Sequence, residues 1–140
     1  MEIIDDKLVV RRFIEDLFNQ GRYAVLDEVL AARWVGHSSG QTQDRAEFEQ
    51  AVRAHRTAFP DLHYVVEDQL ADDDRVATRW TFTGTQTGTM QGIPPSSRHV
   101  SVTGMAIDRV VDGILLESWF EVDINGLLQQ LGVAPVPAGV

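Results

Sequence analysis

The sequence has no cysteine among its 140 residues. Without cysteine a chain cannot build a disulfide framework, use a thiolate nucleophile or bind zinc through sulfur. A protein that does not use disulfides suits a reducing compartment, and we therefore expect this one in the cytoplasm.

Long apolar runs are also absent. The N-terminal segment MEIIDDKLVV turns acidic at Asp5 and Asp6, whereas a secretory signal or a membrane span needs an uninterrupted apolar stretch. We expect neither of these, and no partnership with a membrane.

Positive charge is scarce. The chain has 12 Lys and Arg against 21 Asp and Glu, which gives a formal net charge of -9. A surface of this sign repels the phosphates of nucleic acids and anionic lipid headgroups. We therefore expect no nucleic-acid partner.

The remaining composition is that of a globular domain. Hydrophobic residues make up 44% and charged residues 24% of the chain, which is enough apolar material for a core and too much for a disordered chain. We expect a single domain over residues 1–134. The ending GVAPVPAGV is punctuated by Pro and Gly, so residues 135–140 are expected to form a flexible tail.

Helical periodicity dominates the first half. Apolar residues recur at helical spacing over residues 5–20, and a short second helix is expected over residues 23–30. A third helix is expected from Asp44, an N-cap with Glu47 three residues on, to Pro60. The first half is therefore predicted to be helical.

The second half alternates with period two in Val, Ile, Thr and aromatic residues, which is typical of strands. The segments that show it are LHYVVEDQLA, DRVATRWTFTGT, RHVSVTGMAIDRV and ILLESWFEVD. Between them, DDD at 72–74 and DG at 112–113 are turn sequences, so we expect antiparallel hairpins. This order predicts an α+β fold in which a curved antiparallel sheet wraps around the N-terminal helices as a cone, with an apolar pocket inside.

The last strand contains candidate acids. Alternation places Glu117, Trp119, Glu121 and Asp123 on one face. If that face looks into the cone, Glu121 and Asp123 lie beside aromatic walls, and desolvation there suits a carboxyl to proton transfer. The alternative is that Glu121 is exposed and Asp123 caps a helix formed by INGLLQQL, and the two roles of Asp123 can coexist.

The histidines indicate no metal site. His37, His55, His63 and His99 show neither HxH nor HxxxH spacing. His37 follows Trp34 in RWVGHSSG, where helical periodicity is lost, and is a candidate for the mouth of a pocket; a surface loop is the alternative. His55 lies on the third helix near the face of Val52 and Phe59 and is expected to be hydrogen-bonded at the boundary between core and surface.

Large apolar side chains are candidates for the core, and some of them must line any pocket. Those that we expect to contact a ligand are Phe13, Trp34, Trp80, Met105 and Trp119. Arg79 alternates with Trp80 and is therefore expected on the outer face of the sheet.

Gly84, Gly88 and Gly92 fall four apart in GTQTGTMQGIPPSSRHV. The segment lacks the lysine of a Walker loop and the GxGxxG of a dinucleotide loop, and it is too polar for a membrane GxxxG helix. We expect the end of a strand, where glycine allows close approach of another group, followed by a turn near the rim of the cone.

Three segments resemble the SnoaL-like polyketide cyclase, or ester cyclase, family of the nuclear transport factor 2-like superfamily. They are VRRFIEDLFNQGRYAVLDEVLA, AFPDLHYVVEDQLADDDRVATRWTFTGTQTGTMQGIPPSSRHVSVTG and DGILLESWFEVDINGLLQQLG. The resemblance covers most of the chain. It implies a cystatin-like α+β barrel, a homodimer and no cofactor.

The resemblance also implies roles for particular residues. The family's characterised cyclases close a ring by intramolecular aldol condensation of a polyketide methyl ester, with an aspartate as general acid/base. Asp123 matches that aspartate in the W...D ending. The family's Y..H pattern is matched by WVGH, which ends at His37 and has Trp34 in place of the tyrosine. Many members carry a histidine in the strand that reads VTGMAIDRV here, where this chain has Ala106.

Two hypotheses of function follow, beside a third option, a purely structural protein whose cone is packed full of side chains. In the first, Asp123 removes an α-proton from an apolar, polyketide-like carbonyl compound, and the carbanion attacks a second carbonyl. His37 and Glu121 then orient the substrate or stabilise the developing oxyanion. In the second, a protein of the same fold binds a small molecule without turnover. A hydroxylase or isomerase on this scaffold is a related enzymatic alternative.

Overall fold

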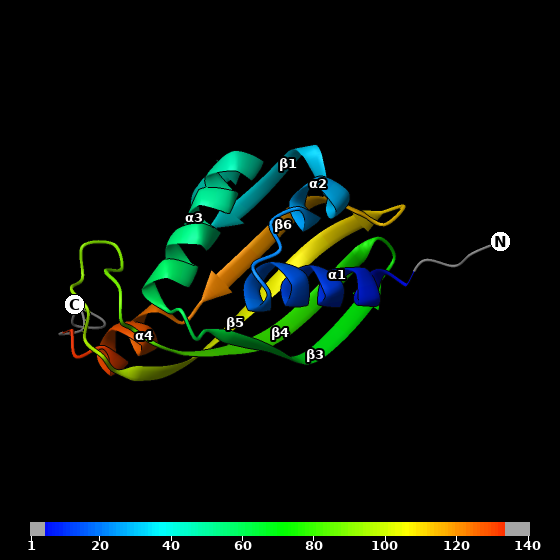
Figure 1. Cartoon of the computed structure of the whole chain (residues 1–140). Coiled ribbons are helices and arrows are strands. Elements are labelled where there is room, and N and C mark those ends of the chain that lie inside the picture. The colour runs from blue at the N-terminus through cyan, green and yellow to red at the C-terminus, as the bar shows by residue number, and fades with distance from the viewer. Residues whose placement is uncertain (1–4, 134–140) are drawn as a thin grey trace.

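A computed structural model describes residues 5–133 and shows a sheet with helices along one side of it (Figure 1). The helices are α1 (Asp6–Ile14), η1 (Glu15–Asn19), α2 (Val25–Val29), α3 (Arg45–Ala58) and α4 (Ile124–Gln130). The strands are β1 (Leu30–Ser38), β2 (Gln41–Asp44), β3 (His63–Asp72), β4 (Arg75–Thr85), β5 (His99–Val111) and β6 (Ile114–Val122). The predicted tail, residues 135–140, lies outside the described residues.

The strands form a curved, unclosed sheet in the order β2-β1-β6-β5-β4-β3. Neighbouring strands are antiparallel except β1 and β6, which run parallel. Figure 1 shows α1, α2 and α3 on one side of the sheet and α4 at the end where β6 finishes. The predicted α+β fold, with a curved sheet around N-terminal helices, is confirmed.

Local signals place the helices as the sequence predicts. α1 continues without a break into η1, a π-helical turn, so that residues 6–19 form one helical segment. α3 begins with the predicted capping box. The Asp44 carboxylate accepts a hydrogen bond from the Glu47 amide at 2.8 Å, and the Glu47 carboxylate accepts one from the Asp44 amide at 3.0 Å. Such reciprocal bonds satisfy N–H groups that a helix start leaves without partners. Among residues 5–133, no helix combines the length and the apolar character that crossing a membrane requires.

Strands β1 and β2 are the main departure from the sequence-based expectation, which placed helices alone in the first half of the chain. RWVGHSSG lies in β1, with Trp34 and Gly36 buried and Val35 and His37 less so. The strand was missed because its main partner, β6, lies far along the chain, so no local pattern reports the pairing.

The predicted turn sequences close hairpins. β3 and β4 pair antiparallel around Asp73, and β5 and β6 pair antiparallel around Asp112 and Gly113. The φ angles of these three residues are 57°, 52° and 78°. They lie in the left-handed region, which tight hairpin turns require and which Asp and Gly tolerate best.

Alternation divides the strands between an inner face, which the helices cover, and an outer face. In β5, Val102 and Val110 are buried on the inner face, whereas Met105 and Ile107 are 55% and 42% exposed on the outer face. Arg79 of β4 pairs with Met105 and is exposed. The prediction that Arg79 lies on the outer face is therefore confirmed.

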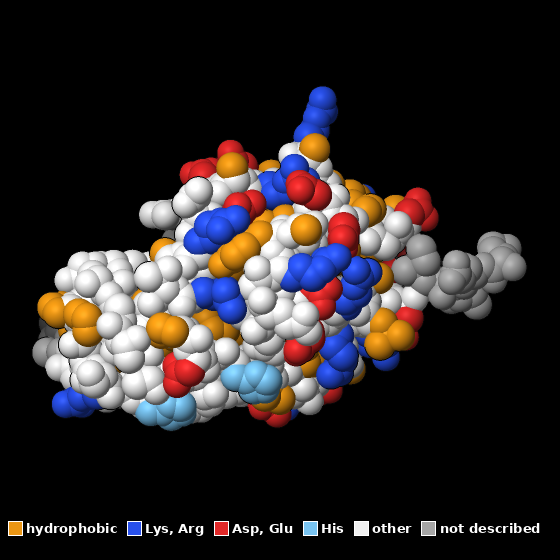
Figure 2. Space-filling view, viewed as in Figure 1, with side chains coloured by type: hydrophobic (Ala, Val, Ile, Leu, Met, Phe, Trp, Pro, Cys, Tyr) orange, Lys and Arg blue, Asp and Glu red, His pale blue; other side chains and the backbone are white. Residues whose placement is uncertain are grey.

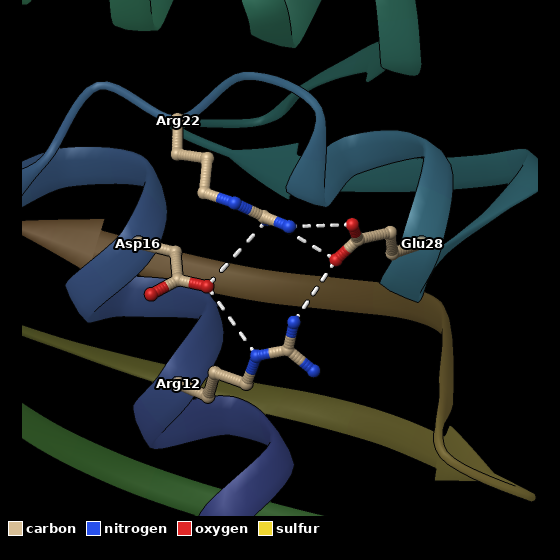
Figure 3. Close-up of polar contacts among 4 residues, drawn as sticks. All are labelled: Arg12, Asp16, Arg22 and Glu28. Carbon is tan, nitrogen blue, oxygen red and sulfur yellow. Dashed lines mark hydrogen bonds and ion pairs between the residues drawn. The ribbon is translucent and has the colours of Figure 1, made fainter.

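Ion pairs join the N-terminal helices at the surface. Arg12 lies 3.3 Å from Asp16 and 3.0 Å from Glu28, and Arg22 lies 3.6 and 2.6 Å from the same two carboxylates (Figure 3). Figure 2 shows the wider setting, in which Lys and Arg side chains are interspersed with Asp and Glu over the helices. Because these charges are exposed, water and salt screen them. The network orients the first helical segment relative to α2 more than it stabilises the fold.

The glycine-rich segment after β4 is anchored to the end of α3. Thr87 and Gly88 donate backbone hydrogen bonds to the Ala58 carbonyl at 3.1 and 3.2 Å. A Cβ atom on Gly88 would lie 2.6 Å from the Thr57 carbonyl oxygen, so the predicted close approach is found here. The buried side chain of Gln86 bonds to backbone groups of the same segment and holds it together.

Candidate active site

Asp123, the predicted general acid/base, lies at the N-terminus of α4. Its carboxylate accepts a hydrogen bond from the Gly126 amide at 3.0 Å, and the residue is exposed. This is the capping role that the sequence offered as the alternative.

The face of β6 that carries Glu121 and Trp119 looks away from the helices. Glu121 pairs with Met105, and Trp119 pairs with Ile107 and His37. The expectation that this face lines the interior is therefore corrected, because β6 joins β5 in a register that turns the opposite set of side chains inward. Met105 and Trp119, two of the predicted ligand contacts, lie outside the interior, as do Glu121 and His37.

His37 belongs to a partly exposed cluster on this outer face. Its Nε2 atom lies 2.7 Å from Glu117 Oε2, and the side chains are 32% and 34% exposed. The imidazole stacks on Trp119 with ring centroids 5.4 Å apart and planes 12° apart. The Arg75 guanidinium lies 5.2 Å from the Trp119 ring centroid. The structure thus brings His37 and Trp119 together on the outer face, which also carries Glu121 and Met105, and away from the predicted ligand contacts of the interior.

Phe13, Trp34 and Trp80, the remaining predicted ligand contacts, are buried in the interior. The Trp34 ring lies 5.0 Å from that of Phe48, which in turn lies 6.3 Å from the Phe13 ring. Trp80 lies against Gly104, its partner on β5, because that glycine has no side chain: a Cβ atom there would overlap the indole. These rings give the interior aromatic walls.

Asp108, which the sequence reasoning did not single out, lies on the inner face of β5 and is 5% exposed. The Ser118 hydroxyl donates a hydrogen bond to Asp108 Oδ1 at 2.5 Å, and Trp34 Nε1 donates one to Ser118 Oγ at 3.0 Å. Burial raises the pKa of Asp108 to about 6, and the hydrogen bond from Ser118 opposes this rise in part. A carboxyl with a pKa this close to neutrality can both take and return a proton.

Alternation in RHVSVTGMAIDRV carried the signal for Asp108. It places the carboxyl on the same face as Val102, Ala106 and Val110. An acid that falls in step with small and apolar residues of a half-buried strand is a buried acid, and buried acids cluster at functional sites.

The inner face beside Asp108 is not completely covered by the helices. Ala106 and Phe120 pair across β5 and β6 on the inner face, and Val122 follows on the same face, yet all three are only half-buried. Inward-facing side chains remain partly exposed where the helices do not cover them completely. We call this partly exposed part of the inner face the opening, and its Ala106 lies one inner-face position along β5 from Asp108.

A second polar pair lies deeper in the interior. His55 of α3 and Tyr64 of β3 are joined by a hydrogen bond of 3.0 Å between Nε2 and Oη. Burial lowers the pKa of His55 to about 4 and raises that of Tyr64, so both side chains are neutral near pH 7. The expectation of a satisfied boundary position for His55 is confirmed, because the residue is half-buried and hydrogen-bonded.

The interior therefore holds an acid with a near-neutral pKa and a neutral imidazole, while the Trp34 indole N–H and the Ser118 hydroxyl proton are taken by the hydrogen bonds that orient the acid. Such groups support proton transfer and hydrogen bonding to the oxygen atoms of an uncharged ligand. Within residues 5–133, no three His, Asp or Glu side chains converge so as to hold a metal ion.

Comparison with known proteins finds a matching family and several solved structures of similar fold. The family model described as SnoaL-like polyketide cyclase matches residues 8–131. AclR, a proposed hydroxylase from Streptomyces galilaeus, is 27% identical, with 93% of this chain and 97% of AclR covered and a TM-score of 0.84. IdmH, a proposed polyketide cyclase from Streptomyces antibioticus, is 28% identical, with coverage of 93% and 100% and a TM-score of 0.83. TsrD from Streptomyces laurentii is 28% identical, with coverage of 94% and 100% and a TM-score of 0.81. No protein of curated function matches the chain.

Proposed function

The chain belongs to the SnoaL-like polyketide cyclase family, and from this premise we propose that it closes a ring in a polyketide-like carbonyl compound by an aldol-type reaction that needs no cofactor. The observation that carries the proposal is the buried Asp108 carboxyl, which lies next to the open part of the inner face and has a pKa of about 6. General acid/base catalysis needs a group of this kind within reach of the substrate.

In the proposed reaction the Asp108 carboxylate takes a proton from a ligand carbon adjacent to a carbonyl group. The electron pair left on that carbon attacks a second carbonyl carbon of the same molecule, which forms the new C–C bond and leaves an alkoxide. The protonated Asp108, or water, then returns a proton to the alkoxide. When Asp108 is the donor its carboxylate is restored directly.

Ser118 and Trp34 act in this scheme as positioning residues. Their hydrogen bonds fix one oxygen of Asp108, Oδ1. Within the described part of the chain no residue donates to Oδ2, and Gln43 Oε1 is the one fully buried side-chain atom without a partner. Asp108 Oδ2 is therefore not sealed from solvent, and it is the oxygen that we assign to proton transfer.

The resemblance assigns the proton transfer to Asp123 instead. Asp123 follows Val122, which lies at the opening, but its carboxylate is exposed and caps α4. Capping does not prevent an acid/base role, so Asp123 is the competing assignment. His37 and Glu121 lie on the outer face, and we propose no catalytic role for them.

We propose that the outer face forms the homodimer interface that the resemblance implies. Leu70, Ala77, Ile107 and Trp119 follow one another across four neighbouring strands of this face. Leu70 is 71% exposed, and Ile107 is 42% exposed. A contiguous exposed apolar row of this kind marks an association surface, and a twofold dimer would place the same row of each protomer against the other.

Binding without turnover is the second candidate function, and Ala106 favours it. The resemblance implies a histidine in this strand, whereas the methyl group of Ala106 offers no proton donor at the opening. Such a protein would hold the same class of ligand against the same walls.

Exchange of the α-protons of α-tetralone in D2O tests the proposal without knowledge of the natural substrate. This bicyclic aromatic ketone carries protons of the type that Asp108 would remove, and proton NMR follows their loss. We expect the wild type to accelerate exchange and Asp108→Asn to lose about 100-fold or more of that acceleration, while Asp123→Asn keeps most of it. Loss of exchange in Asp123→Asn with its retention in Asp108→Asn would assign the proton transfer to Asp123. Binding of α-tetralone with no exchange in any variant would favour the non-catalytic function.

A further inference from the structure

His55 faces the interior from α3. Phe48, Val52, His55 and Phe59 recur at helical spacing and form the inner stripe of this helix. The Phe48 ring lies 6.1 Å from that of Phe120, so the stripe lies over the open part of the inner face. Phe48, Val52 and Phe59 are buried, whereas His55 is only half-buried. The imidazole is therefore the one side chain of this stripe that keeps some exposure.

The position of the imidazole is fixed by its neighbours. Tyr64 Oη lies 3.0 Å from His55 Nε2, and the Phe82 and Phe59 rings lie edge-on to the imidazole at centroid distances of 4.8 and 5.5 Å. The backbone of Tyr64 is itself held, because the Asn19 side chain accepts from its N–H at 2.6 Å and donates to its carbonyl at 2.9 Å. The pair is thus preorganised rather than adaptable.

One nitrogen of His55 is left for a ligand. Among the described residues Nε2 bonds to Tyr64, and none bonds to Nδ1. Nδ1 is not fully buried either, since Gln43 Oε1 is the one buried side-chain atom without a partner in this part of the chain. A neutral imidazole carries one proton. When the Tyr64 hydroxyl donates to Nε2, that proton lies on Nδ1 and is available to an oxygen atom.

The two interior polar pairs are separated by aromatic walls. Tyr64 pairs with Phe82, and Asp108 pairs with Val76, six positions earlier on β4, which corresponds to roughly 20 Å of strand. The Trp80 ring lies between these levels, 5.0 Å from the Tyr64 ring. A ligand bound beside His55 would therefore contact aromatic side chains along this stretch of the inner face.

We propose that His55, held by Tyr64, is a specificity residue of the interior site, and that its Nδ1–H donates a hydrogen bond to a carbonyl or hydroxyl oxygen of an extended aromatic ligand. The inference rests on the proposed function in that it uses the same interior, but it concerns binding and does not require turnover. The side chain acts as a neutral donor, which recognises an oxygen atom without requiring charge on the ligand.

Two matched probes test this inference: 2-acetylnaphthalene, which carries a carbonyl at one end, and 2-ethylnaphthalene, which does not. Their dissociation constants can be measured by quenching of tryptophan fluorescence. We expect the wild type to bind the ketone about five-fold more tightly than the hydrocarbon, the value of one neutral hydrogen bond. His55→Phe should remove this preference and keep the affinity for 2-ethylnaphthalene.

Two further variants test the inference in case His55→Phe does not fold. Tyr64→Phe removes only the hydroxyl that fixes the tautomer and should weaken the preference, while His55→Gln retains an N–H donor and should keep part of it. An unchanged preference in His55→Phe, equal affinity of the wild type for both probes, or no binding of either probe would overturn the inference. Asp108→Asn should leave the preference intact. Loss of exchange in Asp108→Asn and loss of preference in His55→Phe are therefore separate results, and either proposal can fail alone.

Discussion

The hydroxyl of Ser118 donates a hydrogen bond of 2.5 Å to the carboxyl of Asp108, where β6 and β5 pair on the inner face. This contact joins a buried acid to a buried indole, because Trp34 Nε1 in turn donates to Ser118. The chain of bonds orients the one carboxyl that we place at the chemistry, and it makes the behaviour of Asp108 measurable through stability as well as activity.

Asp108→Asn should stabilise the protein at high pH. The folded-state pKa of about 6 lies above the ordinary value of 3.8, so the wild type carries full stability from this group below pH 4 and loses it as the pH rises through 6. The loss amounts to about 3 kcal/mol. Asparagine does not ionise and still accepts from Ser118. Urea unfolding from pH 3.5 to 8 should therefore show that the free energy of unfolding of Asp108→Asn rises relative to that of the wild type as the pH rises. Parallel curves would contradict the burial of an ionising carboxyl.

Ser118→Ala should shift the titration of Asp108 upward. The hydrogen bond from Ser118 holds the pKa of Asp108 below the value that burial alone would give. Removal of the hydroxyl also leaves Trp34 Nε1 without its partner, at a cost of about 1–3 kcal/mol in the free energy of unfolding. We expect the pH at which α-tetralone exchange reaches half of its maximal rate to be higher than in the wild type. A variant whose pH profile matches that of the wild type would show that Ser118 does not act on Asp108.

Protonation of His55 should lower the free energy of unfolding in acid. Its folded-state pKa of about 4 lies below the ordinary 6.5, so its contribution is present above pH 6.5 and is lost as the pH falls toward 4. This loss is about 3 kcal/mol and opposes the change due to Asp108 over the same range. His55→Gln cannot titrate, so its free energy of unfolding should fall less than that of the wild type between pH 6.5 and 4. Equal slopes in urea titrations would contradict a buried, neutral imidazole.

Gly88→Ala should destabilise the anchor between α3 and the segment after β4. Its Cβ would lie 2.6 Å from the Thr57 carbonyl oxygen, a backbone atom that cannot move alone. We expect a loss of about 1–3 kcal/mol in the free energy of unfolding, the usual cost of overpacking. Thr89→Ala, in the same segment, removes side-chain atoms and adds none, and serves as the control. A Gly88→Ala protein as stable as the wild type would show that the segment can separate from α3.

Ile107→Glu should separate the proposed homodimer into monomers. The residue lies in the middle of the exposed apolar row on the outer face, and a twofold interface would bring two such carboxylates into apolar surroundings. Sedimentation should give a dimer for the wild type and a monomer with an unchanged circular dichroism spectrum for the variant. A wild type that is monomeric at high concentration would contradict the proposed interface.

Local chemistry determined which parts of the fold the sequence could predict. The capping box of Asp44 and Glu47 and the turns at Asp73 and Asp112 lie within a few residues of the structure that they specify, and all were found where expected. β1 was missed because its pairing with β6 joins distant segments. Pairing between distant segments also determined which of the predicted site residues lie in the interior.

Alternation correctly separated the two faces of β6 but could not say which one is inner. That choice depends on the register of β6 with β5 and β1, which pairs Trp119 with Ile107 and His37. The predicted site residues were consequently divided between the two faces. Asp108 could have been predicted in the same way, because alternation places it on the buried face of β5 with Val102 and Val110. The prediction of site residues considered the acids of the last strand alone.

The pH dependence of α-tetralone exchange at low ketone concentration identifies the catalytic base, because under these conditions the rate reports the pKa of the free protein's essential base. Assignment of this base to Asp108 predicts a rate that rises with pH through an inflection near 6, the pKa of Asp108, and a rate for Asp108→Asn close to that of buffer alone. An inflection near 4, the ordinary value for an exposed aspartate, or full acceleration by Asp108→Asn would contradict it.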